Sequence, residues 1–488
     1  MDTAKTVKLD QGSLIIILGQ FCIHAILIIS CILYEPLNFQ TESLIYPSSC
    51  FLLLLTLWVF WSWSFITKSL FDPYILFFIA ALLFNGGQII LEIFSLNENG
   101  ILDNKFSTET ILKTIFLVDI GLASFHLGAL ISAAKTRKIN CSINNSKKAT
   151  TNSTTRNTYL IGFCLLGISF FPAIVVLRQA ISVVASGGYF GLYEQEIGTS
   201  FSAAPSVLAG FLVPSAIFIL AGSKEKMKGR LISGCIIVIY SATKFFLGER
   251  NQAVMPLLAF ASLWHKSISP LPKTFLLSTG SLIMFIVFPL VAATRNVSGK
   301  DRLSIDFLVE TFSSINNPAL TSLSEMGGSM MTVAHTIDLV PSIRGFQMGA
   351  EYFYALLTLM PNFFGKIHPT IARGIPDVWL VWEIEPEFAA RGGSFGFSFI
   401  AEAYLNFGWF GAPIALGVMG FLFAKFTLWA ARSGEAARMA TVASYTSFFL
   451  FFARAESALV VRSLVWYSLC PYFSVCLLGW LKSNKLTR

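Results

Sequence analysis

The chain has 488 residues, of which 55% are hydrophobic and only 13% are charged, and its mean hydropathy is +0.67. Soluble proteins carry about a quarter charged residues, so this composition excludes an ordinary soluble globular protein. The formal net charge is +8 and the isoelectric point is near 9.0, values that also occur in nucleic-acid-binding proteins. The positions of the basic residues explain this charge in another way.

Apolar runs of about 20 residues recur along the chain, and each is long enough to cross a hydrocarbon core about 30 Å thick as a helix. The sequence therefore predicts an all-α polytopic membrane protein with about twelve transmembrane helices. The eighth run is short and contains Pro256. The predicted spans are residues 13–33, 47–66, 73–94, 114–133, 158–178, 205–221, 230–247, 252–264, 274–293, 410–430, 437–453 and 461–480.

The lysines and arginines lie mostly on one side of these predicted spans. With a cytoplasmic N-terminus and twelve spans, inside segments such as 135–138 and 224–230 hold most of them. This is the positive-inside pattern of membrane proteins, so both termini are predicted to be cytoplasmic and no nucleic-acid partner is expected. The short outside loops and span ends hold only Lys105, Lys113, Arg178, Arg250, Arg454 and Arg462.

One predicted outside segment, residues 294–395, is much longer than the others. Loops of more than about 15 residues are usually functional or disordered, and this one is rich in Trp, Phe and Tyr, so we expect it to fold. The predicted organisation is residues 1–293 with spans one to nine, residues 294–395 as the large outside loop, and residues 396–488 with a re-entrant or interfacial helix and the last three spans.

Arginines in the outside loops run against the positive-inside pattern and need another explanation. Arg250 lies in a very short turn, and Arg454 and Arg462 are eight residues apart, so these two project to the same side if residues 452–463 are helical. A guanidinium group is a planar fork that matches phosphate oxygens. Together with Arg391, these arginines are predicted to form a diphosphate site.

The stretch RGGSFGFSFIAEAYLNFGWFG (391–411) joins the large loop to the tenth span. Residues 395–406 are predicted to form a separate short helix at the outside surface, with a break between Asn406 and Gly411. On that helix Ser398, Glu402 and Asn406 are four residues apart and form one polar stripe.

An anion site is also predicted before this helix. Arg391, Gly392 and Gly393 precede it, and the exposed N–H groups and positive dipole of a helix N-terminus favour an anion. The plain alternative is that the glycines only allow a tight turn and that Glu402 pairs with a nearby arginine. A lone interfacial arginine, such as Arg295, is likewise more often a lipid-headgroup anchor.

Three stretches are similar to one known family: GGSFGFSFIAEAYLNFGWFG (392–411), GER (248–250) and RAESALVVRS (454–463). With the twelve-span layout, the chain resembles bacterial O-antigen polysaccharide polymerases of the Wzy type. That family joins undecaprenyl-pyrophosphate-linked oligosaccharide repeats at the periplasmic face of the inner membrane. The growing chain is transferred from its lipid diphosphate to a sugar hydroxyl of the incoming unit.

The resemblance implies a multi-span, GT-C-like glycosyltransferase fold in the bacterial inner membrane, with a periplasmic active site and without a metal or cofactor. Glu402 would be the general base or would position an arginine, and Tyr404 would stack on a sugar ring. Whether a chain-length regulator in the membrane is a further partner stays open. The residues implied are Glu402, Arg250 and Arg462 in catalysis, and Arg391, Gly392, Gly393, Arg454, Arg295 and Tyr404 in diphosphate or substrate binding.

Two alternatives stay open at this point. An O-antigen ligase has similar spans and a large periplasmic loop, where His335 or His368 could act as a general base, although loop histidines are more often simply exposed. A flippase or exporter of lipid-linked oligosaccharide is not an enzyme and should carry charges at mid-membrane or on both faces. Most unusual charges here lie on one face, which counts against transport.

Overall fold

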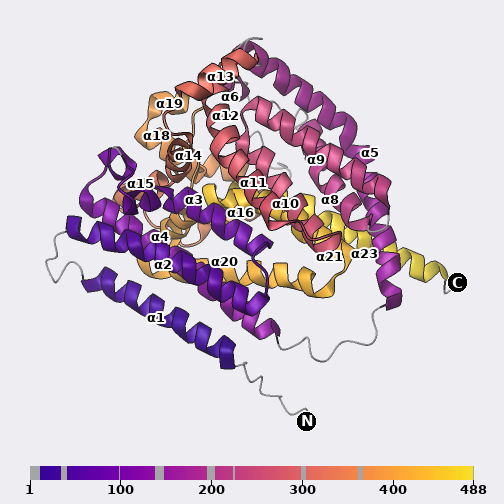
Figure 1. Cartoon of the computed structure of the whole chain (residues 1–488), viewed down its shortest axis with the longest axis horizontal. Coiled ribbons are helices and arrows are strands. Elements are labelled where there is room, and N and C mark those ends of the chain that lie inside the picture. Colours follow the sequence, from indigo (N-terminus) through magenta and orange to yellow (C-terminus); the bar gives the residue numbers. More distant parts are fainter. Residues whose placement is uncertain are drawn as a thin grey trace.

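The computed structural model of the chain describes residues 11–33, 41–97, 99–137, 148–194, 204–223, 226–297, 304–360 and 367–486. Within these ranges the regular structure is helical throughout, without a strand. Figure 1 shows long helices lying side by side, with short helices gathered at one end of them. The prediction of an all-α protein is confirmed.

Short 3₁₀ or π-helical turns join some of the helices: η1 (Ile101–Asn104), η3 (Ile283–Val287), η5 (Leu450–Arg454) and η6 (Val465–Leu469). The α-helices are, in chain order, α1 (Gln11–Leu33), α2 (Thr41–Thr67), α3 (Pro73–Ile93), α4 (Thr108–Arg137), α5 (Lys148–Gly187), α6 (Gly191–Glu194), α7 (Ala204–Ala209), α8 (Leu212–Gly222), α9 (Met227–Leu247), α10 (Arg250–Ser267), α11 (Lys273–Leu282), α12 (Phe288–Thr294), α13 (Ile305–Ser314), α14 (Pro318–Gly327), α15 (Met330–Leu339), α16 (Ala350–Leu357), α17 (Pro369–Arg373), α18 (Pro376–Ile384), α19 (Pro386–Ala390), α20 (Phe399–Ser433), α21 (Ala436–Phe449), α22 (Ser457–Leu464) and α23 (Cys470–Leu486).

In the described part of the chain, 10 helical segments are long and apolar enough to cross a membrane. Helices occupy all the predicted span ranges, but α10 and α21 are not among the ten. α10 has 18 residues and carries charge near both ends, and α21 has only 14 residues. The polytopic membrane class is confirmed, and the predicted number of about twelve exceeds the ten by these two helices.

The centre of the bundle is a close contact between α4 and α20. A side chain at Gly128 would overlap the carbonyl group of Gly417, and one at Gly420 would overlap the carbonyl group of Phe125. Small residues of this kind let two membrane helices approach each other closely. The Phe125 ring also packs against the ring of Phe399, at 6.0 Å between centroids. α20 is therefore fixed at the core of the molecule.

The predicted break in the stretch 391–411 is confirmed, but the predicted position of its helix is wrong. α20 begins at Phe399 rather than at residue 395, and Gly408 (φ 62°, ψ −163°) interrupts it. Residues 399–406 are buried within the protein. Their polar side chains bond to other helices, which offsets the cost of burying them.

Residues 294–395 form helices α13 to α19, as far as they are described, so the expectation that this loop folds is confirmed. The loop packs directly on the membrane helices. A Cβ at Gly87 of α3 would lie 2.9 Å from the Cα of Gly327 on α14, and the Gln88 side chain donates to the Ser324 carbonyl at 3.0 Å. This contact fixes α14 on α3.

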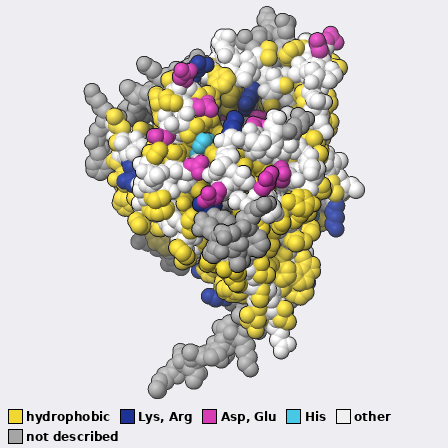
Figure 2. Space-filling model, turned by 90° about the vertical axis from the view of Figure 1, so that its left-hand side faces the viewer, with side chains coloured by type: hydrophobic (Ala, Val, Ile, Leu, Met, Phe, Trp, Pro, Cys, Tyr) yellow, Lys and Arg dark blue, Asp and Glu magenta, His cyan; other side chains and the backbone are white. Residues whose placement is uncertain are grey.

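The ends of the long helices fall at two sides of the molecule. In Figure 1 the first residues of α1 lie at the bottom, and the first residues of α5 and the last residues of α23 lie at the right, whereas α14, α15, α18 and α19 lie toward the upper left. Figure 2 shows acidic and basic side chains gathered over the upper part of one face, above a broad hydrophobic surface. These four short helices therefore lie apart from the two ends of the described chain.

Candidate active site

The turn that carries Arg250 depends on one glycine. α9 ends at Gly248, which has φ 90° and ψ 2°, and α10 begins two residues later at Arg250. This left-handed conformation favours glycine, and a Cβ there would also lie 2.9 Å from the Cβ of Arg295. The turn therefore places Arg250 and Arg295 beside each other.

Arg250 makes a two-pronged ion pair with Glu325 of α14. Its Nη1 donates to Glu325 Oε2 at 2.9 Å, and its Nη2 donates to Glu325 Oε1 at 2.5 Å. Nη1 also donates to the carbonyl oxygen of Phe288 at 3.2 Å. Arg295 Nη2 lies 3.8 Å from the same Glu325 Oε1, and its guanidinium lies 5.3 Å from the ring centroid of Tyr189.

Arg454, at the end of η5, is the third arginine beside Glu325. Burial raises the pKa of Glu325, but the hydrogen bond and charge of Arg250 and the charges of Arg295 and Arg454 hold it below its ordinary value. Arg454 is half-buried, and burial and then the charge of Arg250 lower its pKa. We call Arg250, Arg295, Arg454 and Glu325 the arginine cluster. Arg250 and Arg295 pair with Glu325 and Arg454 acts on it through its charge, so three guanidinium groups and one carboxylate give the cluster a net positive charge.

The prediction that Gly392 and Gly393 lie at the N-terminus of a helix is wrong. Arg391 is exposed at the end of α19, and Ser398 caps α20 by accepting from the N–H of Ile400 at 3.1 Å. Gly392 adopts φ 76° in the turn after α19, and a Cβ at Gly393 would lie 2.5 Å from the Phe388 ring. These two glycines therefore allow a tight turn.

Gly396 is the glycine of this stretch that meets an arginine. It has φ 71°, and a Cβ there would lie 3.1 Å from the carbonyl oxygen of Arg454 and 3.3 Å from its Nε. The next residue, Phe397, donates its N–H to the same carbonyl oxygen at 3.2 Å. The loop before α20 therefore forms one wall around Arg454.

The predicted helix over residues 452–463 is interrupted. η5 ends at Arg454, Ala455 is extended (φ −145°, ψ 165°), and α22 begins at Ser457. Arg462 is exposed on α22, and no described contact joins it to the arginine cluster. The prediction that Arg454 and Arg462 share one side of a helix is therefore wrong, because the chain turns between them.

The polar stripe of α20 bonds to three other elements. Ser398 donates to Asn85 of α3 at 2.6 Å. Glu402 is fully buried and accepts hydrogen bonds from the backbone N–H (2.9 Å) and the hydroxyl of Ser457. Asn406 accepts from the N–H of Gly349 at 3.0 Å. The side chain of Glu402 thus holds the first turn of α22, and among the described residues it pairs with no arginine.

Three other predicted residues have structural contacts. Tyr404 is only 3% exposed, with its ring edge-on to the rings of Phe346 and Trp409 at 6.0 and 5.6 Å, so it offers no open face to a sugar. His368 caps α17 by accepting from the N–H of Thr370 at 3.2 Å. The His335 ring lies 4.6 Å from that of Phe106, and burial lowers the pKa of His335.

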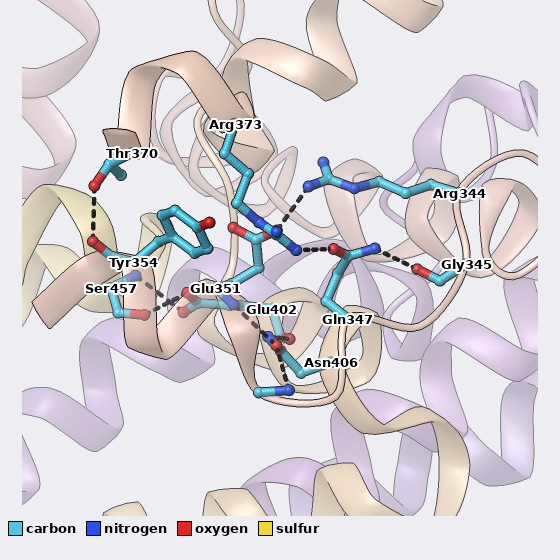
Figure 3. Close-up of polar contacts among 11 residues, drawn as sticks. Arg344, Gly345, Gln347, Glu351, Tyr354, Thr370, Arg373, Glu402, Asn406 and Ser457 are labelled. Atoms are coloured by element: carbon cyan, nitrogen blue, oxygen red, sulfur yellow. Dashed lines mark hydrogen bonds and ion pairs between the residues drawn. The ribbon is translucent and has the colours of Figure 1, made fainter. Parts of the chain in front are cut away.

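A second pair of arginines, which the sequence did not single out, shares Glu351 of α16. Figure 3 shows Arg344 and Arg373 approaching this buried carboxylate, with Asn406 and Glu402 below it. Glu351 Oε1 lies 2.6 Å from Arg344 Nη2 and 3.5 Å from Arg373 Nε. Each guanidinium also lies over a ring, Arg344 over Trp379 and Arg373 over Tyr354. These contacts hold the loop helices together around the start of α16.

Glu456 is another residue that sequence reasoning did not select. It is fully buried between Arg454 and α22, and neither carboxylate oxygen has a hydrogen-bond partner in the described part of the chain. Burial, followed by the charges of Asp377, Glu402 and Glu351, raises its pKa well above the ordinary value. A buried carboxyl group without partners at the edge of a charged cluster is typical of a functional site.

A family model described as O-antigen polysaccharide polymerase Wzy matches residues 15–485 of the chain. No curated protein and no solved structure matches it.

Proposed function

The chain belongs to the O-antigen polysaccharide polymerase Wzy family, and from this premise we propose that the arginine cluster binds the diphosphate of a lipid-linked donor. Family membership makes the chain a membrane-bound O-antigen polymerase that acts on a lipid-linked oligosaccharide. The proposal adds the chemical identity of the link, undecaprenyl diphosphate, and the residues that hold it.

The observation that carries the proposal is that Arg250 and Arg295 pair with one carboxylate, Glu325, on which the charge of Arg454 also acts. These residues are far apart in the sequence, and burying charge beside a membrane is costly, so charges kept there usually have a function. Glu325 balances only one of the three guanidinium groups. The remaining positive charge would stabilise the negative charge that develops on a departing diphosphate.

In the proposed reaction the growing glycan leaves its lipid diphosphate and is transferred to a sugar hydroxyl of the incoming lipid-linked unit. We assign Arg391 and Arg462 supporting roles in substrate binding, because both are exposed and no described contact joins them to the cluster. Glu402 has a positioning role: it fixes Ser457, three residues after Arg454.

We further propose that the large loop and the arginine cluster face the periplasm and that both termini are cytoplasmic. The positive-inside pattern supports this orientation. The arrangement in Figure 1, in which α14, α15, α18 and α19 lie apart from the start of α1 and the end of α23, is consistent with it.

The test is substitution of each clustered arginine in a strain that lacks the gene. The deletion strain should carry lipopolysaccharide core with a single repeat unit and no ladder. Arg250→Ala, Arg295→Ala and Arg454→Ala should each lower the polymerisation rate at least about 100-fold, the usual cost of removing one transition-state donor. Arg462→Ala should cost less than any of these.

Arg178→Ala is the matched control, because Arg178 is exposed on α5 and should support a normal ladder. Amounts of inserted protein are compared by immunoblot of membranes. A full ladder from both Arg250→Ala and Arg454→Ala, at normal insertion, would contradict the diphosphate site.

A further inference from the structure

Two carboxyl groups lie near Arg454 in addition to Glu325. Asp377, near the start of α18, is half-buried, and Glu456 is fully buried two residues after Arg454. The loop before α20 connects Asp377 with Arg454. Ser394 donates its hydroxyl to both oxygens of Asp377 at 2.7 and 2.8 Å, and Gly396 of the same loop lies against Arg454.

We propose that Asp377 is the general base of the polymerisation. This inference rests on the proposed function, since it concerns the same reaction. Asp377 is the member of the pair that an acceptor sugar can reach, whereas Glu456 has no exposed surface. The hydroxyl of Ser394 shows that an O–H group can approach both oxygens of Asp377 at hydrogen-bond distance.

Electrostatics support this role. Burial, followed by the charges of Asp377, Glu402 and Glu351, raises the pKa of Glu456. Burial raises the pKa of Asp377, and the hydrogen bond from Ser394 and the charge of Arg454 oppose this rise. A carboxylate with a raised pKa is a stronger base than an ordinary aspartate.

The transfer step balances as follows. The acceptor hydroxyl loses its proton to Asp377, and its oxygen forms a bond to the anomeric carbon of the growing glycan. The bond between that carbon and the diphosphate oxygen breaks, and the electron pair leaves with the lipid diphosphate.

The first experiment compares Asp377→Asn with wild type, using full-length protein in lipid nanodiscs and a lipid-diphosphate-linked repeat unit. The polymerisation rate should fall at least about 100-fold, the usual contribution of a general base. Binding of undecaprenyl diphosphate alone should stay within about threefold, because the arginine cluster is intact. Glu383→Gln, an exposed carboxylate on the same helix, is the control and should keep the wild-type rate.

A second experiment uses the exposed Ser394, whose removal should not disturb folding. The hydrogen bond from Ser394 lowers the Asp377 pKa, so Ser394→Ala should move the acid limb of the rate profile to higher pH. Ser394→Ala is compared with wild type from pH 4 to pH 8, on the order of the range where carboxyl groups with raised pKa titrate.

The outcomes separate this inference from the proposed function. A wild-type rate in Asp377→Asn, or an unshifted acid limb in Ser394→Ala, would overturn the general base while leaving the diphosphate site in place. Failure of the proposed function would appear differently, as unchanged binding of undecaprenyl diphosphate by Arg250→Ala.

Discussion

Arg250 is placed to bind an anion, although its guanidinium group already has hydrogen-bond partners. Its guanidinium group is 9% exposed, and Glu325 and the Phe288 carbonyl take up its donors. Removing one member of a buried ion pair costs more stability than replacing both members, because the remaining charge is left without a partner. Glu325 is therefore expected to stabilise the fold as well as the site.

The residue-scale prediction is that Glu325→Gln destabilises the protein by about 1–2 kcal/mol at pH 7, less than for a fully buried pair because the glutamate is partly exposed. The folded-state pKa of Glu325 is lowered, so its stabilisation is present above the ordinary pKa and is lost as pH falls through the lowered value. The difference in melting temperature between wild type and variant should shrink in acid. A constant difference down to about pH 3 would contradict the ion pair.

At the scale of elements, the position of Glu325 depends on how α14 sits on α3. The two helices meet at Gly87 and Gly327, with no side chain between their backbones. Gln88 adds hydrogen bonds to the carbonyl and hydroxyl of Ser324, each at 3.0 Å. The loop helix that carries the carboxylate of the arginine cluster is thus held by a membrane helix.

The element-scale prediction is that Gly327→Val lowers the polymerisation rate at least about tenfold. The new Cβ would lie 2.5 Å from the backbone nitrogen of Gln88, so α14 must move and Glu325 with it. Gly345→Val is the matched control in the same loop, since a Cβ there meets nothing within 4 Å. Equal rates for the two variants, at equal insertion, would show that α14 does not position the site.

At the scale of the whole molecule, the arrangement of helix ends predicts the topology. A fluorescent protein fused after residue 488 should fluoresce, because it folds in the cytoplasm. Alkaline phosphatase inserted at Gly345 should be active, because it requires an oxidising periplasm. The opposite pair of results would place the large loop, and the arginine cluster with it, on the cytoplasmic side.

Sequence patterns predicted the features of the whole molecule more completely than they predicted the contacts between side chains. Apolar runs have a length that the bilayer fixes, so helices appeared in every predicted span, and Arg250 and Arg454 stood out because they break the positive-inside pattern. Glu325 and Asp377 could not be found in this way. Acidic residues are ordinary in a loop, and only the packing of α14 and α18 makes these two different from their neighbours.

The helix break before α22 could not be predicted from the sequence either. Ala455 and Glu456 are compatible with a helix, and tertiary contacts at Ser457 override that tendency. For Gly392 and Gly393 the error was the opposite one: the sequence pattern predicted an anion site, and the structure has a turn there. The glycine that touches an arginine is Gly396.

The arginine cluster takes Arg250 and Arg295 from the chain before residue 298, and Glu325 and Arg454 from the chain after residue 303. Synthesis proceeds from the N-terminus, so the two earlier arginines enter the membrane before their carboxylate exists. An unfinished chain can display positive charge to lipid-linked glycans but has neither Glu325 nor the loop around Arg454. The biosynthetic order thereby allows the arginine cluster to be completed only after Arg454 has been added to the chain.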